Sequence, residues 1–193
     1  MGYIYFLLGG ARSGKSSYAE EMAKQLSEDI AYIATAEIID EEMQKRIEAH
    51  KSRRPDTWAT FEFENSNPEP GDYREILKNI AQRKCEVVLI DCITILLFRL
   101  IHKYRLDELE IIENNLEKKI EDEVAVFFKE FLELTKRSRL KFIIVSNEVG
   151  MGVVPSYPLG RIFRDLMGTV NKQIAAVSDE VYFFIAGLRQ KIK

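Results

Sequence analysis

The chain has 193 residues, of which 46% are hydrophobic and 31% are charged, and its formal net charge is −3. This is enough chain for one substantial core, so we expect a single domain over residues 1–193. The acidic balance argues against a globally basic nucleic-acid binder, and no nucleic-acid partner is predicted. Two cysteines, Cys85 and Cys92, are too few for a disulfide framework or a cysteine-rich zinc site, which favours a reducing compartment.

Five short apolar runs are predicted to be strands. They cover residues 3–8, 30–36, 86–91, 141–146 and 180–186. Each run is continuously apolar, as expected of strands that helices cover on both faces. Segments with helical periodicity alternate with them, at residues 15–27, 40–51, 72–83, 107–137 and 161–178. The alternation predicts an α/β fold with a mostly parallel central sheet flanked by helices.

The predicted helix over 107–137 is unusually long and carries one apolar stripe. The stripe consists of Leu109, Ile112, Leu116, Ile120, Val124, Phe127, Phe131 and Leu134. We interpret it as a surface that packs on the core or on another subunit. Residues 64–72, "ENSNPEPGD", are predicted to form a surface loop within the one domain. Apolar runs such as 93–98 are too short to cross a bilayer, so we expect a cytoplasmic protein with no membrane span.

The stretch "GGARSGKS", residues 9–16, matches the Walker A pattern and lies between a predicted strand and a predicted helix. Its glycines allow a tight turn whose N–H groups point at phosphate oxygens, and the dipole of the following helix adds partial positive charge. An accidental glycine-rich turn is the alternative, but the strand and helix on either side favour phosphate binding. We predict that Lys15 reaches the β- and γ-phosphates and that the Ser16 hydroxyl ligates Mg²⁺. The predicted nucleotide contacts of the loop are Gly9, Gly10, Ala11, Arg12, Ser13, Gly14, Lys15 and Ser16.

An apolar strand ending in an acid supports this prediction. "VVLIDC" ends its apolar run at Asp91, which is the form of a Walker B carboxylate that holds Mg²⁺ directly or through water. Apolar runs ending in Asp are also common strand termini. A metal-binding role for Asp91 is therefore predicted only together with phosphate binding by residues 9–16, the phosphate loop. Together the two motifs predict a nucleoside triphosphate, GTP or ATP, as co-substrate with Mg²⁺.

A basic cluster surrounds one of the two histidines, within "QKRIEAHKSRRP" at residues 44–55. One interpretation is the solvated end of a helix, whose cations complement the helix dipole, and the residues alone favour it. The other is that the cluster faces the triphosphate and that neutral His50 attacks the α-phosphorus and expels pyrophosphate. Neighbouring cations would then offset the negative charge that develops. The other histidine, His102, is predicted to lie at the surface.

Taken in order, these segments resemble the bifunctional adenosylcobinamide kinase / adenosylcobinamide-phosphate guanylyltransferase family of cobalamin biosynthesis. The resemblance covers nearly the whole chain. It rests on "GGARSGKS" (9–16), "YIATA" with "DEEMQKRIEAHKSRRP" (32–55), "IDCIT" (90–94), "SNEVGMGVVP" (146–155) and "RIFRDLMGTVNKQIA" (161–175). The resemblance implies a RecA-like P-loop fold and a cobalamin-pathway transferase that can assemble as a trimer.

The resemblance also implies two reactions. The γ-phosphate of GTP or ATP passes to the aminopropanol hydroxyl of adenosylcobinamide, the corrinoid substrate. GMP from GTP is then placed on a histidine and transferred to the new phosphate, which gives adenosyl-GDP-cobinamide. The family histidine that carries GMP matches His50, and this reverses the preference drawn from the residues alone. The further nucleotide contacts that the resemblance implies are Ala34, Thr35, Ala36, Lys51, Ser52, Arg53, Arg54, Glu62 and Asp91.

Some positions depart from the family pattern or carry no assignment. After "DCIT" the typical family segment has an asparagine near the position of Arg99. The sequence assigns no role to Glu148, nor does it decide whether the turn at 150–155 contacts the corrinoid. Two other functions are considered: a P-loop kinase for another small alcohol, and a nucleotide-dependent switch. Neither would leave GMP on the protein.

Overall fold

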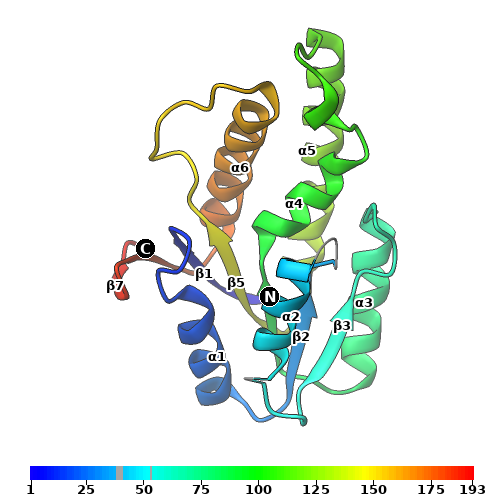
Figure 1. The fold of residues 1–193 in the computed structure, drawn as a ribbon. Helices are drawn as coiled ribbons and strands as arrows, with labels where there is room; N and C mark the ends of the chain where they lie inside the picture. Colours follow the sequence, from blue (N-terminus) through cyan, green and yellow to red (C-terminus); the bar gives the residue numbers. More distant parts are fainter. Residues whose placement is uncertain (38–40, 53) are drawn as a thin grey trace.

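A seven-stranded sheet forms the centre of the computed structural model, which describes residues 1–37, 41–52 and 54–193. The strands are β1 (Tyr3–Gly9), β2 (Ile30–Ala34), β3 (Ala59–Glu62), β4 (Val87–Asp91), β5 (Lys141–Asn147), β6 (Glu180–Ile185) and β7 (Leu188–Lys191). Their order in the sheet is β3-β2-β4-β5-β1-β6-β7 (Figure 1). The first six pair in parallel, and β7 pairs antiparallel with β6. The predicted mostly parallel sheet is confirmed.

Helices cover both faces of this sheet (Figure 1). They are α1 (Lys15–Leu26), α2 (Glu41–Lys51), α3 (Pro70–Gln82), α4 (Ile93–His102), α5 (Asn114–Arg137) and α6 (Pro158–Val177), with a 3₁₀ turn at Leu106–Glu108. Successive strand residues point to opposite faces, so Ile4 and Phe6 pack with α3 to α6, whereas Leu7 packs with α1. Within the described part of the chain, no helix is both long and apolar enough to cross a membrane.

Three elements were not predicted: β3, α4 and β7. The apolar run 93–98 is part of α4, a helix buried on most of its surface. Residues 64–69 form the expected loop, but α3 already begins at Pro70. β2 ends at Ala34, two residues before the predicted end. The two edge strands were missed because they have four residues each and are partly or wholly exposed.

The long helix α5 begins at Asn114, so the prediction of a helix from residue 107 was wrong. Leu109 and Ile112 both lie before the start of this helix, and Leu109 is exposed. Further along the stripe, Ile120, Val124 and Phe127 are buried, and α5 contacts α3, α4 and α6 of the same chain. Packing on the core therefore accounts for the stripe, and packing on another subunit stays a prediction.

Candidate active site

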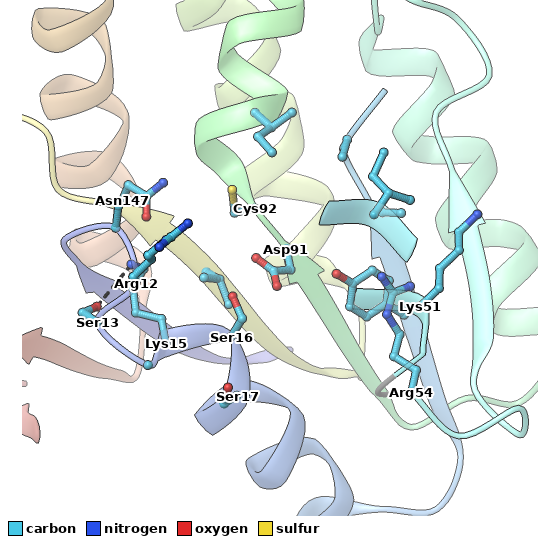
Figure 2. Close-up of a pocket in the computed structure, with 18 of the residues that line it drawn as sticks. Arg12, Ser13, Lys15, Ser16, Ser17, Lys51, Arg54, Asp91, Cys92 and Asn147 are labelled. Atoms are coloured by element: carbon cyan, nitrogen blue, oxygen red, sulfur yellow. Dashed lines mark hydrogen bonds between the residues drawn. The ribbon is translucent and has the colours of Figure 1, made fainter. Parts of the chain in front are cut away.

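A cavity of about 620 Å³ opens beside the phosphate loop, at the carboxyl ends of the parallel strands (Figure 2). The strand register aligns Ala34 with both Glu62 and Asp91, and aligns Asp91 with Val145. These four residues from β3, β2, β4 and β5 therefore form one row along the sheet edge, and all four line the cavity. The carboxyl edge is where open α/β sheets bind ligands, and the volume suits a small molecule such as a nucleotide.

The phosphate loop connects β1 to α1 and forms one wall of the cavity. Two of its glycines are required by the backbone. A Cβ on Gly9 would lie 2.4 Å from the Phe184 carbonyl oxygen of the neighbouring strand β6. Gly14 has a φ of 94°, in the left-handed region that other residues rarely adopt. Of the predicted loop contacts, the structure places Ala11, Arg12, Ser13, Gly14, Lys15 and Ser16 on the cavity wall.

Lys15 lies inside the loop, with only 4% of its surface exposed. Its Nζ donates to the carbonyl oxygens of Gly9, at 2.9 Å, and Gly10, at 2.6 Å. Burial lowers the pKa of the ammonium group, although Asp91 nearby acts in the opposite direction. An ammonium held in this way is already desolvated, so phosphate oxygens entering the loop would gain strong charge-assisted contacts.

The opposite wall is formed by α2 and the residues that follow it. Lys51 and Arg54 line the cavity there, and the Lys51 Nζ lies 3.7 Å from Oε1 of Glu62. The Arg54 guanidinium lies over the Tyr32 ring, 3.4 Å from its centroid, which is a cation–π geometry. Figure 2 shows Arg12 and Lys15 on one side of the cavity, Lys51 and Arg54 on the other, and Asp91 between them.

Two members of the predicted basic cluster lie outside the described part of the structure: Arg53 entirely, and His50 in its side chain. His50 belongs to the last turn of α2, and its predicted role stays a prediction. Ser52 is exposed. His102 is exposed at the end of α4, as predicted.

Thr35 ties the ends of two central strands together. Its fully buried hydroxyl accepts a hydrogen bond from the Cys92 N–H and donates one to the Cys92 carbonyl, both at 2.8 Å. This contact fixes the exit of β2 against the exit of β4, and so fixes the backbone at Asp91. Ala34 and Ala36 on either side line the cavity. That Thr35 also contacts the nucleotide stays a prediction.

Arg99 of α4 is a buried cation, with 6% of its surface exposed. Its guanidinium donates to the carbonyl oxygens of Thr35 (3.1 Å), Phe63 (3.1 Å) and Asn65 (2.6 Å), and Glu37 lies 3.7 Å from its Nε. Burial lowers the pKa of this guanidinium. The side chain thus holds together the loops that leave β2 and β3.

Sequence reasoning missed several wall residues, and strand register is the signal that could have found some of them. The missed residues that line the cavity are Ser17, Tyr32, Ile47, Cys92, Ile95, Val145 and Asn147. Asn147 pairs with Gly9 across β5 and β1, so the end of a predicted strand places it beside the loop. Its N–H donates to Thr94 Oγ1 at 2.8 Å, and its carbonyl accepts from Asn171 Nδ2 at 3.1 Å.

The comparisons with known proteins agree with this geometry. A sequence model of the family described as "Cobinamide kinase / cobinamide phosphate guanyltransferase" matches residues 5–192. The chain is 36% identical, over 98% of its length and 99% of the relative's, to the bifunctional adenosylcobalamin biosynthesis protein CobU of Escherichia coli K12. It is 35% identical, with the same coverage, to the protein of the same name from Salmonella typhimurium LT2.

Among solved structures, a prototypical ATPase from the type III secretion system of pathogenic bacteria is similar to the chain with a TM-score of 0.58. The match covers 99% of this chain and 57% of that one at 8% identity, so it bears on the fold alone. It confirms the predicted RecA-like P-loop α/β fold. With the family model matching nearly end to end, the chain belongs to the cobinamide kinase / cobinamide phosphate guanyltransferase family of enzymes.

Proposed function

We propose that this chain catalyses both reactions of its family in the one cavity. It would phosphorylate adenosylcobinamide with GTP or ATP, and would then transfer GMP from GTP to the product through His50. The observation that carries the proposal is the arrangement of the two walls. The phosphate loop with Lys15 forms one wall, and α2, which contains His50, contributes Ile47 and Lys51 to the other. One bound triphosphate can therefore be reached from both sides.

In the kinase step, Lys15 and the N–H groups of the loop bind the β- and γ-phosphate oxygens. The acceptor hydroxyl attacks the γ-phosphorus in line, the bond to the β–γ bridging oxygen breaks, and the nucleoside diphosphate leaves. Ser16 and Asp91 both line the cavity and offer a hydroxyl and a carboxylate, the oxygen donors that Mg²⁺ prefers. We propose that they hold this ion, which neutralises charge on the phosphates.

In the guanylyl step, the neutral imidazole of His50 attacks the α-phosphorus and pyrophosphate leaves, so GMP is held on the histidine through a P–N bond. The phosphate of adenosylcobinamide phosphate then attacks the same phosphorus and frees the imidazole. Lys51 and Arg54 line the cavity, where their charge can stabilise the negative oxygens of both transition states. His50 is in the last turn of α2, three residues after Ile47 and one before Lys51. Ile47 and Lys51 both line the cavity.

We also propose that the protein acts in the cytoplasm as a homo-oligomer, with three subunits as the expected number. Cys85 and Cys92 are free and buried, which is compatible with a reducing compartment. Sedimentation equilibrium of the purified protein will give the number of subunits, and a mass of one chain at all concentrations would contradict the oligomer.

The test is covalent labelling. The protein is incubated with Mg²⁺ and GTP labelled at the α-phosphate, and is then denatured. We expect a label that is labile to acid and stable to alkali, as a phosphoramidate is. It should be absent from His50→Ala and present in His102→Ala, the matched control at the exposed histidine. Label that persists in His50→Ala would contradict the proposed nucleophile. An unlabelled wild-type protein that still phosphorylates an alcohol would favour the plain kinase.

A further inference from the structure

The loop between β5 and α6 is unusually apolar for a segment in contact with water. Of residues 148–157, which connect the two elements, only Glu148 is charged, although 31% of the chain is charged. Met151, Val153, Val154 and Tyr157 are each between 60% and 94% exposed. Contiguous exposed apolar side chains of this kind mark binding surfaces in soluble proteins. We refer to residues 148–157 as the apolar loop.

The apolar loop begins at the phosphate loop itself. The N–H of Glu148 donates to the carbonyl of Gly9 at 3.0 Å, and Asn147, the residue before it, lines the cavity. Within the loop, the Glu148 carboxylate accepts the Gly150 N–H at 2.5 Å. The first turn is thus fixed against the start of the phosphate loop, which is where the β- and γ-phosphates are proposed to bind.

The far end of the apolar loop is also anchored. Arg161 Nη1 donates to the carbonyl oxygens of Pro155 (3.2 Å) and Ser156 (2.8 Å). The exposed side chains therefore lie between two fixed ends. In Figure 1 the segment arches from the end of β5 to the start of α6, on the same side of the view as the turn between β1 and α1.

We propose that the apolar loop is the docking surface for the corrinoid acceptor, through Met151, Val153 and Val154. The inference rests on the proposed function. The acceptor hydroxyl must approach the γ-phosphorus at Lys15 while the nucleotide fills the cavity. Most of the acceptor therefore has to lie outside the cavity, against the residues that border its phosphate-binding end. A corrinoid is a broad, flat macrocycle with many methyl substituents. Its faces suit apolar Val side chains and the flexible Met side chain, which adapts to an irregular apolar outline.

The test compares Met151→Ser, Val153→Ser and the double variant in the full chain with Ile111→Ser. Ile111 is 81% exposed and does not line the cavity, so it controls for the loss of a surface apolar group. In the kinase reaction, we expect the KM for adenosylcobinamide to rise by about tenfold or more in the double variant. The kcat, the affinity for GTP and the labelling by GTP should stay at wild-type values, and Ile111→Ser should match the wild type throughout.

Labelling by GTP separates the two proposals, because it needs no corrinoid and reports that each variant is folded. Wild-type KM in a double variant that still labels would overturn the docking surface and leave the proposed function standing. Failure of the wild-type protein to label would contradict the proposed function instead. If the double variant sediments as a smaller species and its KM depends on protein concentration, the loop is an interface between copies of the chain, and the docking proposal is overturned.

Discussion

The guanidinium of Arg99 joins the loops that leave β2 and β3 through hydrogen bonds to main-chain carbonyls of both loops. We predict that Arg99→Met lowers the free energy of unfolding by about 2–4 kcal/mol. The substitution leaves several carbonyl oxygens without a donor, and each unpaired buried acceptor costs about 1–3 kcal/mol, but water that reaches some of them reduces the total. Urea denaturation at neutral pH measures the change, provided that the slope of the transition is the same in both proteins.

Arg99→Lys serves as the control for charge alone. A lysine keeps the cation but lacks the planar fork of donors, so it cannot serve Thr35, Phe63 and Asn65 together. Its stability should lie between those of Arg99→Met and the wild type. If Arg99→Met unfolds at the wild-type urea concentration, the hydrogen bonds to these carbonyls contribute nothing to stability.

Lys15 and Lys51 lie on opposite walls of the cavity but differ in burial. Lys15 is buried against loop carbonyls, whereas the Lys51 side chain is 55% exposed and pairs with Glu62 at 3.7 Å. We predict that Lys15→Met weakens GTP binding by about 30-fold or more, the cost of removing a desolvated charge partner. Lys51→Met should have a smaller effect, because water and salt screen an exposed charge. Calorimetric titration with GTP will measure both, and equal losses would contradict the distinction.

At the scale of elements, Glu180 connects three strands at one edge of the sheet. Its carboxylate accepts hydrogen bonds from Lys191 of β7 at 2.7 Å, Tyr182 of β6 at 2.5 Å and Tyr3 of β1 at 2.8 Å. These contacts lower the pKa of Glu180 to about 2, and the bond to Glu180 raises the pKa of Tyr3 to about 12. The antiparallel strand β7 is therefore attached to the sheet partly through one ionised carboxylate.

The pH dependence follows from the sign of that shift. The pKa of Glu180 is lower in the folded state than the value of about 4.3 in an unfolded chain, so the stabilisation is complete above that value and is lost as the pH falls towards 2. We predict that Glu180→Gln has a lower melting temperature than the wild type at pH 6, and that the difference shrinks through pH 4 and vanishes near pH 2. Calorimetry across this range will measure it. A difference that stays constant with pH would contradict the role of the charge.

The elements that could be predicted are those whose own residues determine them. β1, β4 and β5 are buried on both faces, so an unbroken apolar run predicts them. The run of α4 is just as apolar because that helix is itself buried, and periodicity cannot distinguish a short buried helix from a strand. β3 and β7 form only because β2 and β6 offer free edges. Pairing of this kind depends on the rest of the sheet, so the four residues of such a strand do not by themselves predict it.

The residues of the candidate site also fall into two groups, those that local sequence predicts and those that depend on the order of the strands. The phosphate loop and Asp91 could be placed at the site because their signals are local: a glycine-rich turn between a strand and a helix, and an acid at the end of an apolar run. Asn147 and Tyr32 line the cavity only through the order of the strands, and Ile95 lines it from α4, a helix that was not predicted. These positions depend on contacts between residues far apart in the chain. A single sequence without the sheet order does not specify them.

The cavity draws its walls from the phosphate loop, from β2, β3, β4 and β5, and from the helices α1, α2 and α4, so nucleotide binding should stabilise the whole molecule and not one part of it. If residues 1–193 form a single domain, heating should give one cooperative transition. At a GTP concentration one hundred times Kd, ligand linkage contributes about 2.7 kcal/mol. For a domain of this length we therefore predict that the entire transition moves up by about 5–10 °C.

Differential scanning calorimetry with and without GTP and Mg²⁺ will test this prediction. In Lys15→Met at the same GTP concentration, the upward shift should fall to less than half, because weaker binding reduces the linkage term. The shape of the transition matters as much as its position. Two separate transitions of which only one moves would show that the nucleotide stabilises a part of the chain, because a single cooperative domain has to gain the binding free energy as a whole.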